Sequence, residues 1–347
     1  MLISYRWLQS ASALKKLERK SFLETKAKMQ WWYVDIVMND GSVLMMAFVP
    51  RKWWPDTPDA NLDDALVMVS WLSAADGRVR SVSSTLDASR MRVSGERGLS
   101  LEIPGAISIT RSPEELGTYR FGFELPEVQG SVEVRALARP FSAFPGGRLP
   151  ALGRAALLGS PLGGDAFEYI SHVPRGAASG ALTMGSEKVA VDGHAYHEQG
   201  RFDEAPERLS KGWFWCHFLH PEWNIFGSPG VFMYVQQQQR LDQPIFSGFN
   251  LFDRSMGFKN KTTSGDPAHH KVFSGGEMRF AYDGLKLSIA ADPNKNKPPL
   301  LSFPSATTKQ IYHTLVTDAE LTVQRGGGGA ADKVAGQMIL ESCWLAL

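Results

Sequence analysis

The feature that most limits the possible folds of this chain is a long succession of short apolar–polar alternations separated by tight turns. Between residues 91 and 137 the chain contains the segments MRVSG, LSLEI, AISIT, YRFGFEL and SVEVRAL, separated by short polar stretches with Gly or Pro. Alternation with a period of two residues is typical of strands with one buried face, and helical periodicity is almost absent. We therefore predict an all-β fold of antiparallel barrels or sandwiches.

Two stretches predict β-hairpins. Residues 30–50 place Asn39-Asp40-Gly41 between two apolar segments, and residues 66–83 do the same with Asp76-Gly77. In the first strand of the first hairpin, alternation places Trp31, Tyr33 and Asp35 on one face. The other face carries Trp32, Val34 and Ile36. Asp35 then either lines a cavity beside two aromatic rings or points to solvent near a strand end, and the pattern leaves both open.

The length of the chain favours two domains. A chain of 347 residues is long for a single core, and 43% hydrophobic with 21% charged residues is an ordinary globular composition. Residues 1–29 show weak helical periodicity and are expected to form an N-terminal helix or arm. We place one β domain at 30–210 and the second at 211–347, after the charged loop DEAPERLSK. The segment 51–64 is expected to be a loop long enough to act as a lid, and 140–165 a long connection.

Charge and cysteine content exclude several classes of protein. A formal net charge of +1 gives no sign of a nucleic-acid or acidic-lipid partner. Only Cys216 and Cys343 are present, so neither a disulfide framework nor a zinc motif is expected. The first residues lack the apolar core of a signal peptide, and no run approaches the roughly 18 apolar residues of a membrane span. We expect a cytoplasmic protein, whose oligomeric state the sequence leaves open.

Residues 193–223 concentrate ionisable and aromatic side chains. Four of the chain's eight histidines and three of its ten tryptophans lie in this stretch, GHAYHEQGRFDEAPERLSKGWFWCHFLHPEW. Ionisable groups held between large rings acquire shifted pKa values by desolvation, and such groups concentrate at functional sites. We expect the chemistry of the protein to lie here.

An extended conformation decides which of these side chains can act together. On a strand, His197, Gln199 and Arg201 share one face, and Tyr196 and Glu198 share the other. In the next predicted strand one face carries Trp213, Trp215 and His217. The two histidine pairs in this stretch, 194 with 197 and 217 with 220, are each spaced by three residues, which sets the members of a pair on opposite faces. No metal site is expected.

Three segments occur in an order that matches a known family. The first is Trp31-Trp32-Tyr33, followed by a strand, Asp40-Gly41 and a second strand. The second is VPRGAASGALTMGSEKVAVDGHAY, and the third is Tyr196-His197-Glu198 followed by Gly212-Trp213-Phe214-Trp215. In these segments, which span about residues 30–347, the chain resembles the carotenoid 1,2-hydratase and AttH-like family.

The resemblance implies two tandem lipocalin-like β domains, with a cavity at or between them for a large apolar ligand. Similar proteins include hydratases of polyene double bonds and lipocalin-like cyclases of the Diels–Alderase type, and neither group uses a redox cofactor. Gln199 and Arg201-Phe202 stand where the family has a second histidine and Trp-Gly. This departure favours a cofactor-free cyclase or isomerase of a natural-product pathway. The alternatives are a hydratase and a non-catalytic carrier of a lipid or pigment.

Candidate roles follow for the residues singled out above. Glu198 is the first candidate acid because burial raises a carboxyl pKa, and His197 and His217 are candidates for the partner base. Tyr196 or Gln199 can donate a hydrogen bond to a substrate carbonyl, and indole rings stabilise a cation formed by protonation of an alkene. The residues expected to bind substrate are Trp31, Tyr33, Asp35, Gln199, Arg201, Trp213, Trp215 and Asn250. A structural alternative pairs Glu198 with Arg201 or Arg208.

Overall fold

The computed structural model describes two compact units. It covers residues 29–344 apart from 52–63, 96–98, 113–114, 116, 143–166, 203–211, 229–231, 239–245, 250–256, 265–270, 283, 305–310 and 327–328. One unit contains the described residues of 29–142 and 167–202, and the other contains those of 212–344. We call them the N-terminal and the C-terminal domain.

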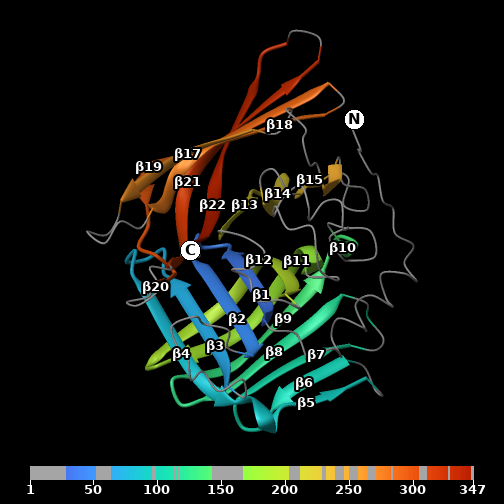
Figure 1. The fold of residues 1–347 in the computed structure, drawn as a ribbon, viewed down its shortest axis with the longest axis vertical. Helices are drawn as coiled ribbons and strands as arrows, with labels where there is room; N and C mark the ends of the chain where they lie inside the picture. The colour runs from blue at the N-terminus through green and yellow to red at the C-terminus, as the bar shows by residue number, and fades with distance from the viewer. Residues whose placement is uncertain are drawn as a thin grey trace, which may run out of the picture. The chain divides into compact units, whose positions relative to one another are not determined.

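The N-terminal domain is one 12-stranded antiparallel sheet with the order β4-β3-β2-β1-β12-β11-β9-β8-β7-β6-β5, and β10 pairs with β11 (Figure 1). Its strands are β1 (Met29–Met38), β2 (Val43–Arg51), β3 (Asp64–Leu72), β4 (Val79–Asp87), β5 (Arg92–Ser94), β6 (Leu99–Ile103), β7 (Ile107–Arg111), β8 (Thr118–Leu125), β9 (Val128–Ala136), β10 (Phe141–Ser142), β11 (Phe167–Met184) and β12 (Glu187–Phe202). A single 3-10 turn, η1 (Ala88–Arg90), joins β4 to β5. The sheet curls so that apolar residues of β1–β3 and of β6–β9 form one core.

The first hairpin shows how alternation builds this core. Trp32, Val34 and Ile36 of β1 are buried in the hydrophobic core, and Leu44 of β2 lies opposite Ile36. The turn between β1 and β2 contains Gly41 at φ +85°, a left-handed conformation that glycine adopts without steric cost. The predicted division of β1 into two faces is therefore confirmed.

Strand β11 departs from regular pairing at the point where it faces the middle of β12. Its register against β12 shifts between Ser171 and Val173, and again between Val173 and Gly176. Such bulges insert extra residues and re-aim side chains. As a result Val173 and the preceding His172 both face the barrel interior, where His172 stacks on His197 with the ring centroids 5.2 Å apart.

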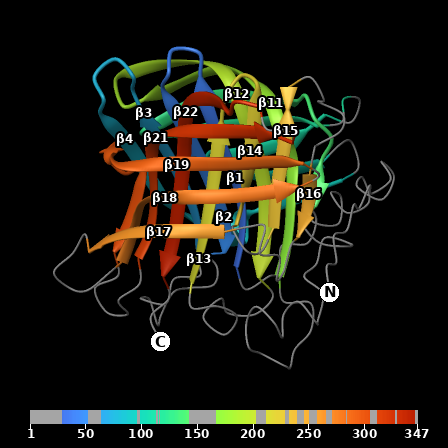
Figure 2. The ribbon, with the colours of Figure 1, turned by 90° about the horizontal axis from the view of Figure 1, so that it is seen from above.

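The C-terminal domain is a 10-stranded antiparallel sheet with the order β16-β15-β14-β13-β22-β21-β19-β18-β17, and β20 pairs with β21. Its strands are β13 (Gly212–Leu219), β14 (Trp223–Ser228), β15 (Phe232–Gln237), β16 (Phe246–Phe249), β17 (Gly257–Ser264), β18 (Lys271–Tyr282), β19 (Leu285–Asn296), β20 (Leu301–Pro304), β21 (Ile311–Arg325) and β22 (Asp332–Trp344). Figure 2 shows β17, β18, β19 and β21 running side by side. The domain has its own apolar core, to which Phe218, Ile289 and Leu340 belong.

These observations confirm the predicted all-β class with two β domains in tandem. Both predicted hairpins are present, as β1–β2 and β3–β4. The predicted N-terminal helix or arm, the domain boundary at 210, the loop after residue 51 and the long connection fall on residues outside the described ranges, so they remain predictions. In the part of the chain that the structure describes, no helix has the length and apolar character needed to cross a membrane.

The core of the N-terminal domain is expected to tolerate truncation poorly. Leu44 is 0% exposed and Leu137 is 40% exposed, so Leu→Ala at the two positions is the same chemical change in opposite environments. We expect Leu44→Ala to lower the free energy of unfolding by about 2–5 kcal/mol because it leaves a cavity, and Leu137→Ala to change it by about 0.5 kcal/mol or less. Urea unfolding followed by circular dichroism measures both, and equal effects would contradict the core described above.

Candidate functional site

Strand β1 and residues 195–202 of β12 are largely buried on both faces, and the two faces differ in chemistry. One face belongs to the apolar core, through residues such as Val34 and Ala195. The other face, which we call the network face, carries Trp31, Tyr33 and Asp35 of β1, Tyr196 and Glu198 of β12, and Tyr169 of β11. In the register of β1 with β12, Tyr33 lies opposite Glu198, and Asp35 lies opposite Tyr196. Strand pairing therefore gathers residues that are more than 130 positions apart in sequence.

A chain of hydrogen bonds runs along the network face. The indole Nε1 of Trp31 donates to Oε1 of Glu198 at 2.9 Å. The hydroxyl of Tyr196 donates to the other carboxylate oxygen, Oε2, and the hydroxyls of Tyr169 and Tyr196 are hydrogen-bonded to each other. Both carboxylate oxygens thus accept hydrogen bonds, as expected of an ionised carboxylate. The Trp31–Glu198–Tyr196–Tyr169 chain joins three neighbouring strands.

Gly200 makes the approach of Trp31 possible. It lies opposite Trp31 in the β1–β12 pair, and a Cβ built on it would lie 2.0 Å from Cζ2 of the indole. Without a side chain at this position, the indole lies across β12 and reaches Glu198. Around it, the ring of Phe202 lies 5.6 Å from Trp31, and Phe202 stacks on Phe167 at 4.8 Å. Trp31 and Phe167 are partly exposed, so this aromatic cluster is the open end of the network face.

The environment of Tyr196 keeps its hydroxyl protonated. The side chain is completely buried, and this burial, with the negative charge of Glu198 and the neighbouring Tyr169, raises the pKa of Tyr196 well above 10. Tyr196 is therefore a hydrogen-bond donor at any physiological pH. Asp35 is 0% exposed, so the alternative in which it points to solvent is excluded.

His197 lies on the core face of β12, whereas its neighbour Glu198 lies on the opposite, network face. Its Nδ1 is 2.9 Å from the carbonyl oxygen of Tyr33, and its ring packs edge-on against Tyr119 and Phe121. Burial, together with the neighbouring His172, lowers the pKa of His197 well below 6.5. Among the described residues, its Nε2 has no hydrogen-bond partner. The imidazole is neutral and faces away from the Glu198 carboxylate.

Gln199 and Arg201 share the core face with His197, as alternation predicts. Oε1 of Gln199 lies 3.2 Å from Nε2 of His172, and Arg201 lies opposite Glu168 in the β11–β12 pair. Both side chains are buried. The structural alternative in which Glu198 pairs with Arg201 does not fit this register, because the two residues point to opposite faces. Arg208 lies outside the described residues.

In the C-terminal domain, His217 occupies the face of β13 opposite the apolar core. It is fully buried, its Nε2 lies 2.8 Å from Oδ1 of Asn224, and its ring is 5.8 Å from that of Trp215. The backbone of Trp213 pairs with Cys343, but its side chain, like Asn250, lies outside what the structure describes. Trp215 and His217 thus share a buried face, in agreement with the sequence pattern.

The sequence analysis did not identify two residues of the site, Tyr169 and His172. Both lie in the segment FEYISHV, which contains only one aromatic residue between its ends and no obvious catalytic spacing. Their partners, Tyr196 and Gln199, are 27 positions downstream. Only the length of the β11–β12 hairpin and the bulge at His172 decide these contacts, and neither is encoded in a local motif.

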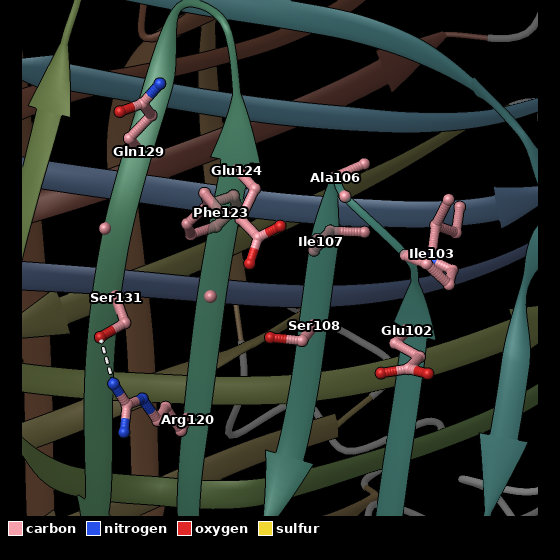
Figure 3. Close-up of a pocket in the computed structure, with 14 residues that line it drawn as sticks. Glu102, Ile103, Ala106, Ile107, Ser108, Arg120, Phe123, Glu124, Gln129 and Ser131 are labelled. Carbon is pink, nitrogen blue, oxygen red and sulfur yellow. Dashed lines mark hydrogen bonds between the residues drawn. The ribbon is translucent and has the colours of Figure 1, made fainter.

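The described residues offer no cluster of three His, Cys, Asp or Glu side chains arranged to hold a metal ion. They do form a groove of about 710 Å³ along β6–β9 (Figure 3). Arg120 of β8 donates to Ser131 of the neighbouring β9 at 3.1 Å, and Gly122 also lines the groove. None of the site residues predicted from the sequence lines it.

The position of Gly200 gives a test of the network geometry. We expect Gly200→Ala to displace the Trp31 indole, because the new methyl group would occupy its place, and to break the hydrogen bond to Glu198. The indole N–H resonance of Trp31, assigned with Trp31→Phe, should move toward the position of a solvent-exposed indole. Gly329→Ala is the matched control because a Cβ at Gly329 has no atom within 4 Å. An unmoved resonance in Gly200→Ala would show that the indole does not lie over Gly200.

The buried imidazole of His197 predicts loss of stability in acid. The unfolded chain takes up a proton as the pH falls through about 6.5, whereas the folded chain does not, so folding stability decreases below that pH. We expect His197→Asn, which keeps a donor for the Tyr33 carbonyl but cannot titrate, to reduce this pH dependence by up to about 1.4 kcal/mol per pH unit. Urea unfolding at pH 5, 6, 7 and 8 measures the slope, and an unchanged slope would contradict the assignment.

Comparison with known proteins supports the architecture. No protein-family model and no curated sequence matches the chain. Among solved structures it is similar to CghA in complex with Sch210972, with a TM-score of 0.58, 13% identity, and coverage of 92% of this chain and 88% of that one. It is similar to kievitone hydratase from Nectria haematococca, with a TM-score of 0.58, 11% identity, and coverage of 92% and 90%.

A third similar structure is a putative AttH from Nitrosomonas europaea, with a TM-score of 0.55, 16% identity, and coverage of 91% of this chain and 93% of that one. At these identities the likeness establishes the fold and not the activity. The fold predicted from the family resemblance is confirmed, and the chain has the architecture of two tandem lipocalin-like β domains.

Proposed function

We propose that the protein is a cofactor-independent enzyme of the cyclase or isomerase type, which acts on C=C bonds of a large apolar polyene, polyketide or terpenoid metabolite. The single observation that carries this proposal is the carboxylate of Glu198, held by Trp31 and Tyr196 on a buried face lined with aromatic rings. An apolar wall with a few fixed polar groups is the usual composition of a small-molecule site. The similar structures include a hydratase and a protein crystallised with Sch210972, and this similarity supports an enzyme.

Glu198 acts as the proton acceptor and donor in this proposal. Its ionised carboxylate takes a proton from one carbon of an activated alkene and returns it to another, so that the double bond moves and no proton is gained or lost overall. Tyr196 stays protonated and stabilises the charged carboxylate before and after the transfer. The Trp31 indole fixes the second carboxylate oxygen through its Nε1 hydrogen bond.

The other predicted residues take supporting roles. Tyr33 and Asp35 form the wall of the network face beside Tyr196, whose ring lies 6.4 Å from that of Tyr33. His197 acts from the core face as a positioning residue, because it binds the carbonyl of Tyr33. Gln199 and Arg201 belong to the same supporting layer. Trp215 and His217 form a second buried polar–aromatic group in the C-terminal domain, and we assign them ligand contact there. Ligand contact by Trp213 and Asn250 stays a prediction from the sequence.

A hydratase is the second candidate function. It is favoured by the similarity to kievitone hydratase, and it uses the same groups. In that reaction protonated Glu198 would deliver its proton to an alkene carbon, water would add to the resulting cation, and the added water would return one proton to the Glu198 carboxylate. A non-catalytic carrier differs from both enzymes because it would bind its ligand without needing the Glu198 carboxylate for any conversion.

The function is tested with metabolites of the protein's own host. An apolar extract from cells that lack the protein contains its accumulated substrate, and wild-type protein should convert one component, detected by liquid chromatography and mass spectrometry. A product of unchanged mass indicates cyclisation or isomerisation, and a gain of one water indicates hydration. We expect Glu198→Gln to lower the rate of conversion by about 10²- to 10⁴-fold, because it removes general acid–base catalysis, while ligand binding persists.

Glu127→Gln is the matched control for this experiment, because Glu127 is exposed in the turn between β8 and β9. It should leave the rate of conversion unchanged. Full conversion by Glu198→Gln would exclude acid–base catalysis by this carboxylate. Binding of one extract component that is never converted, by wild type and variant alike, would identify a carrier.

A further inference from the structure

Strand β8 has one face in the apolar core and one face toward solvent. On the solvent face Arg120 and Glu124 are exposed, and Gly122 between them is partly exposed. All three residues line the groove along β6–β9 (Figure 3). A guanidinium and a carboxylate therefore lie on either side of a position that has no side chain, in a groove that shares no residue with the network face.

The glycine at position 122 is not explained by the packing of the strand. A Cβ built on Gly122 would lie 2.5 Å from the Oγ of Ser108, a hydroxyl that can rotate away, and no other atom would lie nearer than 3.9 Å. By contrast, a Cβ on Gly130 would lie 2.2 Å from the backbone oxygen of Ala181, so close strand contact requires glycine there. Glycine inside a strand weakens it and often marks a position where a ligand approaches the backbone closely.

Two hydroxyl groups complete the surroundings of Gly122. Ser108 of β7 and Ser131 of β9 are its direct cross-strand neighbours. Figure 3 shows the Ser108 hydroxyl pointing toward β8 and the Arg120 guanidinium reaching Ser131. Ser131 accepts this hydrogen bond, so it keeps its own proton to donate, and the guanidinium keeps further N–H groups. Gly122 thus has opposite charges along its own strand and a hydroxyl on each neighbouring strand.

The two charges beside Gly122 are not neutralised within the described part of the chain. There Arg120 has no carboxylate within ion-pair distance, and the Glu124 carboxylate has neither an ion pair nor a hydrogen bond. The third charged side chain of the groove, Glu102, lies 4.0 Å from Arg92. A ligand that matches the remaining charges carries one positive and one negative group. Because the Cα atoms of Arg120 and Glu124 are about 14 Å apart along an extended strand, these groups must lie at the two ends of the ligand.

We propose that this groove binds a short zwitterionic peptide, whose carboxylate pairs with Arg120 and whose ammonium group pairs with Glu124. The peptide backbone lies over Gly122, where its amide groups exchange hydrogen bonds with the hydroxyls of Ser108 and Ser131. A single amino acid is too short to reach both charges, and a terminus of a protein carries only one of them. The opposite charges also fix the direction in which the peptide lies.

Triglycine and two blocked forms of it test the proposal. N-acetyl-triglycine lacks the ammonium group, and triglycinamide lacks the carboxylate. Titration of the isotope-labelled full chain at pH 7, followed through the backbone amide signals of the groove residues, gives a dissociation constant for each peptide. We expect triglycine to bind saturably and each blocked form to bind about fivefold more weakly, the upper value of one exposed ion pair.

Each charged residue should have its own signature. We expect Arg120→Gln to remove the difference between triglycine and triglycinamide and to keep the difference between triglycine and the acetylated form. Glu124→Gln should do the reverse. Gly122→Ala should weaken binding of all three peptides, because its methyl group occupies the floor beneath the peptide. Arg135→Gln, which removes an exposed charge of β9 outside the groove, should leave all three dissociation constants unchanged.

Equal dissociation constants of the three peptides for wild type would overturn recognition by opposite charges, and so would full discrimination retained in both charge variants. Absence of saturable shifts at the groove residues would overturn the groove as a peptide site. If a variant does not fold, judged by circular dichroism, the comparison of the three peptides on wild type decides the question. The conversion assay with Glu198→Gln is a separate measurement, so the proposed function and this inference can fail independently.

Discussion

The candidate site depends on one constraint, the register in which β12 pairs with β1 on one side and with β11 on the other. Because side chains alternate along a strand, a slip of one residue would move Glu198 and Tyr196 into the apolar core and bring His197 to the network face. The burial of both faces makes such a slip costly. Apolar residues such as Val34 and Ala195 stabilise the register on the core face, and the hydrogen bonds of Glu198 stabilise it on the network face. The chemistry of the site is thus a consequence of the packing that lies behind it.

Departures from regular strand structure occur where the site needs them. Gly200 removes a side chain so that an indole can lie across β12, and the bulge at His172 turns an extra imidazole into the barrel. Neither feature improves pairing or apolar burial. Glycine in a strand interior weakens it, and a bulge interrupts the ladder of hydrogen bonds. Gly200 lies two positions after Glu198, and the bulge at His172 lies opposite His197 in the β11–β12 pair. Irregular strand geometry at these positions is expected where it serves a functional site.

Much of the fold could be predicted from the sequence, and only part of the site. The period of two and the turn residues at Gly41 and Gly77 determine strands and hairpins locally, so the all-β class and the division of β1 into two faces followed from pattern alone. The placement of Glu198 with Tyr196, and of His197 on the other face, followed from the same alternation. What alternation cannot supply is the pairing partner of a strand. Tyr169 and Trp31 reach Glu198 through contacts over 27 and 167 positions, and no local spacing encodes them.

The two faces of β12 are not independent, although a sheet separates them. His197 binds the backbone carbonyl of Tyr33, and the ring of the same Tyr33 packs edge-on against Tyr196. A change of charge on His197 would turn its second nitrogen into a donor inside the apolar core, where His172 and the aromatic rings of Tyr119 and Phe121 surround it. The neutral state of His197 avoids this unfavourable burial, and the neutral ring fills the core behind Tyr33.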